Sequence, residues 1–378
     1  MRYLTLAHRW MGVVLCLFFA LWFISGAVLI YHPFPTLSQT ERLANTPDIN
    51  FTKIKIAPTT VIVVEKNNGL DRFRLIDVEG RPAYVLHPQK GPLKIIGADD
   101  GERISLLTAK SAGRIVEIFS GKSVLRIEGP LNYDQWIVPN RYDLYRPFYR
   151  IALRDKKETV FYVSARTGEV LQKTEGEERL WNYMGAIIHW IYPTILRSSW
   201  VLWDQIVWWI SLSGVLTAMA GMCLGIARFR KTTFGLSMPT PFKGWLRMHH
   251  ILGLFAGIFV FTWIFSGWLS MDHGRLFSKP IPDASQIQSF RGKSIYQAVK
   301  EISPEAFKTL GDSSEVEIFT TGGQTFVTSR SHPGLKLFKP LTPEFLSPAR
   351  IMQSEIINAV KMSWPEVKIQ STQKLGES

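Results

Sequence analysis

The chain carries one long apolar stretch twice, and each copy has a histidine at both ends. The first copy runs from His8 to His32 and the second from His249 to His273, at a constant offset of 241 residues. Residues 11–30 include no charged side chain. A helix of that length spans roughly 30 Å, the thickness of the hydrocarbon core of a bilayer. The repeat therefore predicts membrane-spanning helices with a histidine near each face.

Three uncharged apolar runs, at 11–30, 206–227 and 251–271, predict three spans. A cleavable signal peptide is the alternative for the first run. That run is long for the apolar region of a signal peptide, and no Ala-x-Ala cleavage site precedes Tyr31, so we favour a retained span. No further apolar run follows, and we expect no fourth span. We assign the transmembrane segments to residues 1–32, 200–228 and 248–273.

The run Trp181–Leu196 is apolar and contains His189, but it is too short to span comfortably, and Arg197 follows it directly. Pro193 would break or kink a helix there. We expect a helix over 181–199 that lies at the membrane interface and leads into the next span.

The net charge is +13, and nucleic-acid binding is one explanation for such an excess of basic residues. Residues 228–248, however, hold five basic side chains and no acidic one, between two predicted spans. The enrichment of Lys and Arg in cytoplasmic loops already accounts for them. We therefore expect loop 229–247 and the N-terminus in the cytoplasm, both soluble parts outside, and no nucleic-acid partner.

The soluble parts, 33–180 and 274–378, alternate apolar and polar residues between Gly-containing turns. This pattern predicts three β-hairpins, listed here: 73–78 with 83–86, 159–164 with 169–171, and 316–321 with 325–328. A helix is expected over 347–362, with Ser347 as its N-cap and Pro348 at its first position. The predicted fold class is an α-helical transmembrane bundle of three spans plus an interfacial helix, with two separate extracytoplasmic α+β domains.

Six of the eight histidines lie at span ends. The inner set is His8, His249 and His250, and the outer set is His32, His189 and His273. A single histidine at a span end can be an interfacial residue whose polar ring atoms contact water. A matched set of histidines at both membrane faces favours a functional role instead. A b-type haem takes one axial imidazole from each of two helices. We therefore predict two haem b groups.

The inner haem is expected to use His8 and His249, with His250 as the alternative ligand. For the outer haem, the three outer histidines are candidates for two places. Asp272 adjoins His273 and is a candidate acceptor for its ring. The remaining two histidines, His87 and His332, precede prolines in the soluble parts and are expected on exposed turns.

Glycines accompany these histidines. On a helical wheel Gly12 and Gly26 fall near the face of His8, and Gly253 and Gly267 near that of His249. Glycine lets a flat ring approach the backbone, although plain helix packing explains each glycine equally well. Zinc or copper is the competing metal, but zinc prefers four ligands close together, often including Cys or a carboxylate. The chain has two cysteines and no Cys-x-x-Cys.

A strip of aromatic and basic residues suits a polar or anionic chelate as substrate. It consists of Arg141, Tyr142, Tyr145, Arg146, Tyr149 and Arg150. An outer basic strand or loop without a ligand is the alternative. The sequence has no HExxH, P-loop or GxGxxG motif. We therefore expect no catalytic side chain beyond the cofactor, which would do the chemistry itself.

Four stretches of the sequence carry motifs of a kind found together elsewhere: Leu-Ala-His-Arg-Trp-Met-Gly at 6–12, a similar stretch at 247–253, Ile188-His189, and residues 161–171. Together they resemble the PepSY-associated transmembrane helix family. The first stretch is similar to the opening of the family's first helix and the second to a repeat of it, whereas Ile188-His189 resembles the second-helix histidine and 161–171 the PepSY strand–turn–strand signature. The resemblance covers most of residues 1–275. Family members often have a fourth span, which this chain is not expected to have.

The resemblance implies a bacterial inner-membrane protein with PepSY-like periplasmic domains. A haem-containing subgroup, the ferrioxamine-type ferrisiderophore reductases, reduces ferric siderophores on the periplasmic side. The expected function is therefore a haem-dependent oxidoreductase that passes electrons to a periplasmic ferric siderophore, from a quinol or a cytoplasmic reductase. The alternative is a siderophore- or peptide-binding or transport module without redox activity.

Overall fold

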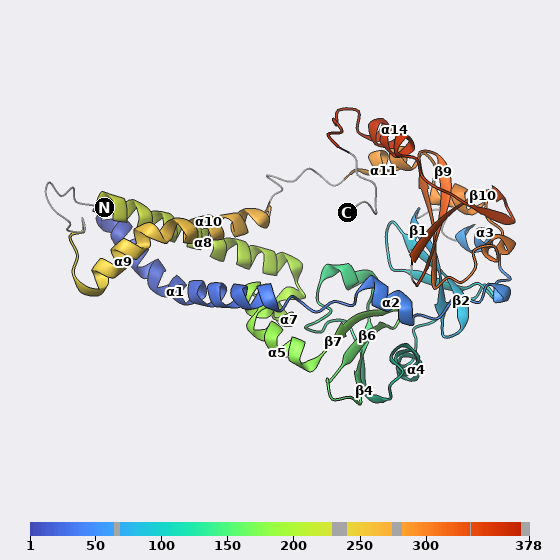
Figure 1. Cartoon of the computed structure of the whole chain (residues 1–378), viewed down its shortest axis with the longest axis horizontal. Coiled ribbons are helices and arrows are strands. Elements are labelled where there is room, and N and C mark those ends of the chain that lie inside the picture. Colours follow the sequence, from blue (N-terminus) through green and yellow to red (C-terminus); the bar gives the residue numbers. More distant parts are fainter. Residues whose placement is uncertain (64–68, 229–239, 274–281, 333, 372–378) are drawn as a thin grey trace. The chain divides into compact units, whose positions relative to one another are not determined.

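The computed structural model describes residues 1–63, 69–228, 240–273, 282–332 and 334–371 (Figure 1). The chain divides into two compact units. The helical unit consists of Met1–Phe34 and Glu177–Pro280. The sheet unit consists of Pro35–Gly176 and Ile281–Ser378. Each unit is built from two segments that lie far apart in the sequence.

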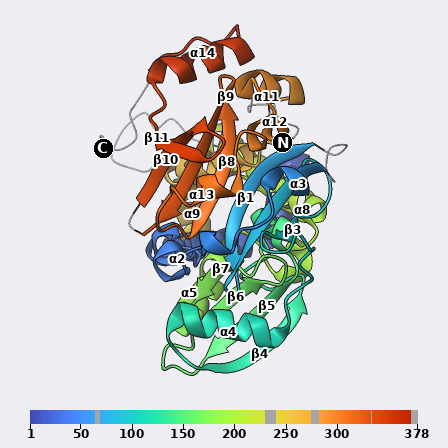
Figure 2. The same cartoon turned by 90° about the vertical axis from the view of Figure 1, so that its right-hand side faces the viewer.

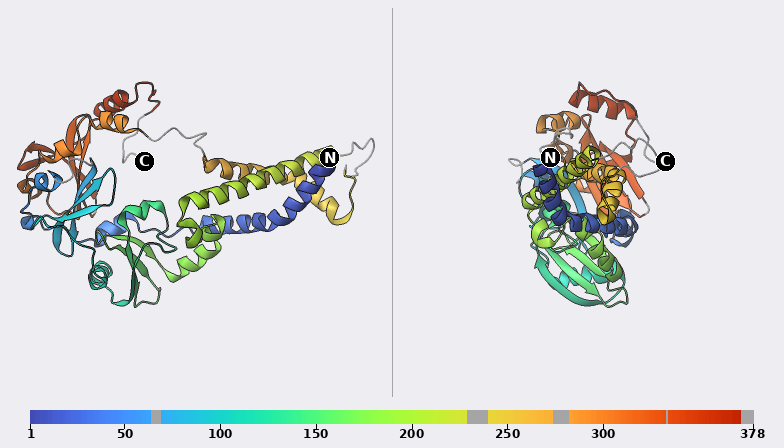
Figure 3. Two further views of the ribbon diagram at one scale, coloured as in Figure 1. Left: turned by 180° about the vertical axis from the view of Figure 1, so that it is seen from behind. Right: turned by 90° about the vertical axis from the view of Figure 1, so that its left-hand side faces the viewer.

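The helical unit contains two helices that are long and apolar enough to cross a membrane, α1 (Arg2–Tyr31) and α8 (Trp200–Ala227) (Figure 3). This confirms the length and apolar character expected of the first two spans. The third is not one straight helix. It is divided into α9 (Gly244–Phe255) and α10 (Gly257–Ser270), which are bent by 54° at Ala256 and count as a span only if taken together. Glycine weakens a helix at such a bend, and Gly257 follows the break directly.

The helix expected over 181–199 is not continuous. Three short helices occupy this part of the chain: α5 (Gly176–Met184), α6 (Ala186–His189) and α7 (Thr194–Arg197). Between α6 and α7, Ile191 has a φ of +51°, which interrupts helical geometry. Pro193 then precedes α7 as its N-cap residue. Helix α6 packs against α1 and so brings His189 to that helix.

The sheet unit contains a seven-stranded antiparallel sheet in the order β11-β10-β9-β8-β1-β2-β3. Its strands are β1 (Leu70–Val78), β2 (Arg81–Pro88), β3 (Lys94–Gly97), β8 (Glu315–Thr321), β9 (Gln324–Ser331), β10 (Gly334–Thr342) and β11 (Phe345–Pro348). Strand β1 pairs with β8, with Phe73 opposite Ile318. The expectation of two separate soluble domains is therefore wrong, because strands from both segments share one sheet.

A second, four-stranded sheet has the order β4-β5-β6-β7. Its strands are β4 (Val124–Leu131), β5 (Phe148–Leu153), β6 (Val160–Ser164) and β7 (Val170–Thr174). Helix α4 (Ala109–Ser120) lies across this sheet (Figure 2). All three predicted hairpins are confirmed, as β1–β2, β6–β7 and β8–β9.

Short helices cover the sheets. They are α2 (Gln39–Asn45), η1 (Phe51–Lys53), α3 (Pro58–Ile62), η3 (Asn140–Tyr145), α11 (Ala284–Arg291), α12 (Ile295–Val299), α13 (Pro304–Phe307) and α14 (Gln353–Ser363). The helix predicted over 347–362 begins later than expected. Ser347 lies in β11, where it pairs with Lys339 of β10, so it does not cap a helix.

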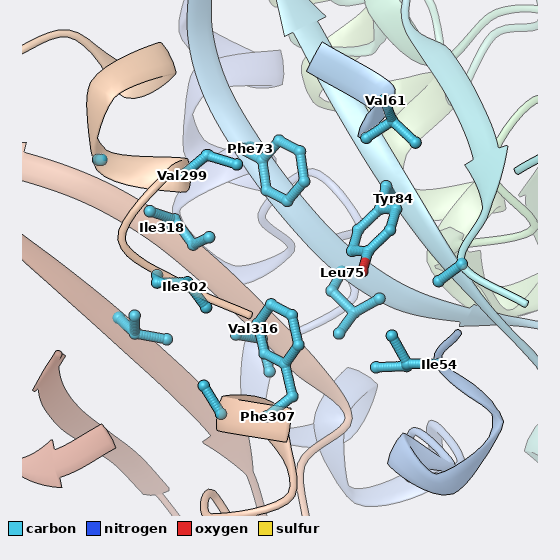
Figure 4. Close-up of a cluster of buried hydrophobic side chains, with 14 of the residues drawn as sticks. Ile54, Val61, Phe73, Leu75, Tyr84, Val299, Ile302, Phe307, Val316 and Ile318 are labelled. Carbon is cyan, nitrogen blue, oxygen red and sulfur yellow. The ribbon is translucent and has the colours of Figure 1, made fainter. Parts of the chain in front are cut away.

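One face of the seven-stranded sheet forms the main core (Figure 4). Phe73, Tyr84 and Phe307 are completely buried there, and the hydroxyl of Tyr84 donates to the carbonyl oxygen of Ile56 at 2.8 Å. Burying a side chain of this size contributes about 1.5–3 kcal/mol. Alternation along β1 sends its other residues to the opposite face. That face carries a buried ion-pair network around Arg74, which is 2% exposed.

Candidate functional site

The inner histidines His8 and His249 come together in the helical unit. Their ring centroids are 6.2 Å apart and their planes are tilted by 39°. His8 Nδ1 lies 3.1 Å from the carbonyl oxygen of Thr217 in α8. Because a carbonyl oxygen only accepts, Nδ1 must donate, and a neutral ring then keeps a free lone pair on Nε2. His8 is thus held in the tautomer that can ligate a metal through Nε2.

A glycine of α8 makes room for this ring. A Cβ added to Gly221 would lie 2.6 Å from His8 Cε1, so no side chain fits there unless His8 moves. One turn after each inner histidine, an added Cβ at Gly12 or Gly253 would meet no protein atom within 4 Å. The backbone beside both rings is therefore accessible to a flat group, as the haem expectation requires.

The spacing of the two rings can be compared with that of an iron held between two imidazoles. A metal–imidazole bond is roughly 2 Å long and the nitrogen lies about 1.1 Å from the ring centre, which separates two collinear rings by roughly 6 Å. The observed 6.2 Å agrees with this value. Within the described residues, no group of three or more His, Cys, Asp or Glu side chains could hold a metal ion, but an axial haem pair needs only two.

His250, the alternative inner ligand, has a different environment. It is 7% exposed, and its Nε2 lies 2.9 Å from the carbonyl oxygen of Gly225. Its Nδ1 lies 2.8 Å from Thr240 Oγ1. Nε2 therefore donates and Nδ1 accepts, so both ring nitrogens are occupied. Of the two adjacent histidines, His249 is the one that approaches His8.

His189 of α6 repeats the arrangement of His8 in the outer set. Its Nδ1 lies 3.1 Å from the carbonyl oxygen of Trp22 in α1, and so it donates to that oxygen. A Cβ added to Gly26 would lie 2.9 Å from His189 Cε1. As at His8, a glycine on the neighbouring helix receives the ring and a main-chain carbonyl fixes its tautomer.

His189 also lines a cavity of about 480 Å³ within the helical unit. The walls are mainly aromatic and include five tryptophan rings, those of Trp22, Trp190, Trp200, Trp203 and Trp263. Arg197 is the one lining residue among those described that carries a fixed charge. The cavity can therefore accept a large apolar group with a polar or charged edge.

His273 is held by residues of α8 that the sequence interpretation missed. Its Nδ1 lies 2.8 Å from Asp204 Oδ2, and its Nε2 lies 3.3 Å from Gln205 Nε2. The expected acceptor Asp272 is wrong for this ring, because Asp204 takes that role. A signal was available, since Asp204 is the one acidic residue in Trp200–Ala227, and acids in apolar helices usually have a function.

The outer histidines are not paired as the inner ones are. His32 stacks on Trp181 with ring centroids 4.5 Å apart and planes within 2°. Across the described part of the chain, no ring contact or hydrogen bond joins any two of His32, His189 and His273. The structure thus brings the inner pair together and gives each outer histidine its own surroundings.

The predicted substrate strip is largely a structural element. Tyr142, Arg146 and Tyr149 are 6%, 8% and 6% exposed. Arg146 Nη2 donates to the carbonyl oxygen of Ile137 at 2.9 Å, and the hydroxyl of Tyr149 donates to that of Leu107 at 3.0 Å. An exposed binding role is therefore wrong for these three residues.

The other members of the strip also have partners within the chain. Arg150 pairs with Glu128 at 2.6 Å and the guanidinium of Arg141 lies over the ring of Tyr142. Tyr145 accepts a hydrogen bond from Arg74 at 3.5 Å. The strip therefore offers no continuous surface for a chelate.

His87 was expected on an exposed turn, and this prediction is wrong. It lies in β2, is 5% exposed, and faces the ion-pair network of the sheet unit. Burial, with the positive charges of Arg74 and Arg72, lowers the pKa of His87 to about 3. The imidazole is therefore neutral at physiological pH. His332 is exposed, as expected.

The sheet unit has a cavity of its own, of about 430 Å³. Helix α2, helix α4 and the turn between β1 and β2 contribute to its lining. Charged residues of both signs, among them Lys53, Arg114 and Glu79, lie beside apolar ones such as Ile118. Such a lining suits a zwitterionic or amphipathic ligand.

Comparison with known proteins adds no relative. The chain matches no family model, no curated protein and no solved structure. What can be said of its function therefore depends on the residues and their geometry.

Proposed function

We propose that the chain is a di-haem b protein of the bacterial inner membrane that passes electrons across the bilayer and reduces a periplasmic ferric siderophore. The observation that carries this proposal is the approach of His8 to His249, at the spacing of two axial imidazoles. Haem, when bound, would supply one-electron transfer, and Fe(III) in the chelate would become Fe(II). The lower charge weakens the attraction of iron to oxygen ligands and so favours release.

The orientation follows from the charges and the helices. In this proposal α1, α8 and the bent pair α9–α10 cross the bilayer, with the N-terminus in the cytoplasm and the sheet unit in the periplasm. The five basic residues of 228–248 support this orientation. The donor is a quinol or a cytoplasmic reductase. The motifs that resemble the PepSY-associated family support the same assignment.

The chain's own residues would bind and orient the cofactor. His8 and His249 would ligate the inner haem, and two of His32, His189 and His273 would ligate the outer one. The bonds from His8 to Thr217 and from His189 to Trp22 fix the tautomers that leave Nε2 free. Such bonds also raise the basicity of a metal-bound imidazole.

A second candidate function is capture of a siderophore or peptide without redox chemistry. The mixed cavity of the sheet unit favours it, because ligands of both kinds combine polar groups with an apolar body. In that case the histidines would serve helix packing alone.

The absorption spectrum of the detergent-purified protein separates the two. We expect Soret and α bands that sharpen with dithionite, and two haems per chain by pyridine haemochrome. Anaerobic addition of ferric siderophores should then reoxidise the haem. A colourless protein expressed with ample haem would refute the haem proposal. A haem protein that no ferric chelate reoxidises would be a cytochrome with another acceptor.

A further inference from the structure

We infer that the cavity of the sheet unit binds a zwitterion with an apolar body, which is the chemistry of a free apolar α-amino acid and of a short apolar peptide. Its volume of about 430 Å³ lies within the range of small-molecule sites. The second candidate function uses the same cavity, but the inference does not depend on whether the helical unit holds haem. It names the ligand class and the side chains that would hold each end of the ligand.

Part of the lining is already neutralised within the protein. Arg42 pairs with Glu315 at 2.8 Å and with Glu169 at 3.4 Å. Arg74 of β1 pairs with the same two carboxylates. Because these lining charges compensate one another, they do not select a ligand by its charge.

Five further charged side chains of the lining are not neutralised in this way. Within the part of the chain that the structure describes, none of them forms an ion pair. Two are positive and three are negative: Lys53, Arg114, Asp48, Asp77 and Glu79. Opposite charges thus border one cavity without pairing with each other directly.

The hydrogen bonds of these side chains involve uncharged groups. Lys53 Nζ donates to the carbonyl oxygen of Gly80 at 2.7 Å, and the amide of Gly80 donates to Asp77 Oδ1 at 2.8 Å. The hydroxyl of Ser314 donates to Asp48 at 3.0 Å. Burial raises the pKa of Asp77 and outweighs both the bond from Gly80 and the charge of Lys53. This carboxylate would therefore gain from a further cation.

An apolar surface lies beside the positive charge of helix α4. Ile118 lines the cavity and is 61% exposed. It follows Arg114 by four residues, so the two side chains lie on the same side of the helix. Ile115 and Leu43 also line the cavity. An apolar group that covers Ile118 would be stabilised by the area that both remove from water.

The cavity therefore selects a ligand that carries both charges and an apolar group. Its ammonium would lie toward Asp77 and Glu79 at the turn between β1 and β2. Its carboxylate would lie toward Arg114, whose guanidinium can form two parallel hydrogen bonds with it. A ligand with one charge alone would leave the opposite set unpaired, in a partly enclosed site where charges interact more strongly than in open water.

Isothermal titration calorimetry of the full-length protein in detergent tests this selection with four probes. They are L-leucine, trileucine, leucinamide, which has no carboxylate, and N-acetylleucine, which has no ammonium. At about pH 7 the α-amino groups are mainly protonated. We expect a zwitterion to bind at least about tenfold more tightly than either singly charged probe, because each of those lacks one set of charged hydrogen bonds. The tighter binder of leucine and trileucine identifies the source as an amino acid or a peptide.

Two substitutions assign the two ends of the ligand. Arg114→Gln should weaken binding of the tighter zwitterion about tenfold and leave leucinamide unchanged, since leucinamide has no carboxylate to lose. Glu79→Asn should weaken the zwitterion similarly and leave N-acetylleucine unchanged. Glu79 has a φ of +55° and precedes Gly80, and Asn-Gly is a favoured pair in such a turn. The unfolding temperature of Glu79→Asn should therefore equal or exceed that of the parent protein.

Matched control variants lie elsewhere in the sheet unit. Lys110→Gln removes a positive charge from the same helix as Arg114, and Glu158→Asn changes another glutamate with a positive φ, of +51°. Neither Lys110 nor Glu158 is among the described residues that line the cavity. Both variants should bind all four probes as the parent protein does.

Three results would overturn the inference. They are no saturable binding of leucine or trileucine, singly charged probes that bind as tightly as the zwitterions, and unchanged binding in both Arg114→Gln and Glu79→Asn. None of them affects the absorption spectrum that tests for haem. The proposed function would then stand or fail on that spectrum alone.

Discussion

His8 and Thr217 are joined by a hydrogen bond of 3.1 Å from the imidazole Nδ1 to a main-chain carbonyl oxygen. That carbonyl oxygen lies within α8 and can accept a backbone hydrogen bond of the helix with one lone pair. Its second lone pair accepts the hydrogen bond from the imidazole. His189 and Trp22 form the same relationship at the same distance in α1. In both cases a glycine one turn further along the accepting helix receives the ring. Two histidines are thus prepared in the same way at separate places in the helical unit.

Replacing either of two adjacent histidines should have different consequences. His249→Ala removes the ring that faces His8, so we expect loss of one haem and retention of the other. His250→Ala removes a buried ring whose two nitrogens are bonded within the protein. It should retain both haems but lower the thermal unfolding temperature, since lost buried hydrogen bonds cost about 1–3 kcal/mol. Pyridine haemochrome and thermal unfolding in detergent measure both effects. The reverse pattern would make His250 the ligand.

Two Gly→Ala changes on neighbouring helices form a matched pair. A Cβ at Gly221 would lie 2.6 Å from His8 Cε1, so Gly221→Ala should displace His8 and remove the inner haem. Gly12→Ala meets no protein atom and gains about 0.5–1 kcal/mol of helix stability. It should therefore leave the unfolding temperature of the haem-free protein unchanged or slightly higher. Equal haem content in Gly221→Ala and the parent protein would refute the placement of His8.

Local patterns predicted much of this fold. Uncharged apolar runs were enough to predict α1 and α8. Alternation of apolar and polar residues on either side of a glycine-containing turn was enough to predict three hairpins. Both patterns can be recognised within one short stretch of sequence. The junction of the two soluble segments could not be found in this way. Strand β1 pairs with β8 across 241 residues, counted from Arg74 to Glu315. A signal did exist, since Arg72 and Arg74 alternate on β1 as Glu315 and Glu317 do on β8.

The candidate site was predicted to a similar extent. The repeat of 241 residues indicated that His8 and His249 belong together, and the structure pairs them. The choice between His249 and His250 depends on which face of α9 meets α8, and adjacent residues on a helix point about 100° apart. Asp204 could not be assigned to His273 from sequence proximity, because 69 residues separate the two and only the packing of the chain brings them together. The burial of Tyr142, Arg146 and Tyr149 could not be foreseen, because it depends on how a loop folds back over a sheet.

Two neighbouring arginines of β1 should differ in their effect on stability. Arg74 is buried and pairs with Glu169 and with Glu315, the latter at 3.0 Å. Arg74→Met would leave both carboxylates with Arg42, and Glu315 also with Arg330. It should therefore cost less than the roughly 3–5 kcal/mol of a wholly unpaired buried charge. Arg72 pairs with Glu317 at 2.7 Å, but its side chain is 44% exposed. Arg72→Met should therefore cost only about 0–1 kcal/mol.

Hydrogen exchange at the amides of β1 and β8 in the full-length protein measures this difference locally. Exchange should accelerate strongly in Arg74→Met and little in Arg72→Met. Equal acceleration in the two variants would contradict a special role for the buried network.

His87 should make the sheet unit sensitive to mild acid. Its pKa is about 3 in the folded protein, because of burial and the positive charges of Arg74 and Arg72, which outweigh the opposing charges of Glu317 and Glu315. In the unfolded chain its pKa is about 6.5. The folded state therefore binds fewer protons between these values. Stability is complete above pH 6.5 and falls as the pH decreases toward 3, at about 1.4 kcal/mol per pH unit.

The window from pH 6.5 to 4.5 isolates this histidine from the network's acids. Burial opposes ionisation of Glu315, but Arg74 and Arg42 outweigh it and bring its pKa to about 2. Its contribution is therefore lost only below the usual glutamate value of about 4.3. His87→Gln removes the titrating group and keeps a polar side chain at the site. The free energy of local unfolding of β2, from hydrogen exchange corrected for intrinsic rates, should be flat across this window in His87→Gln and fall in the parent protein. If the variant kept the slope of the parent, another group would have to be its source.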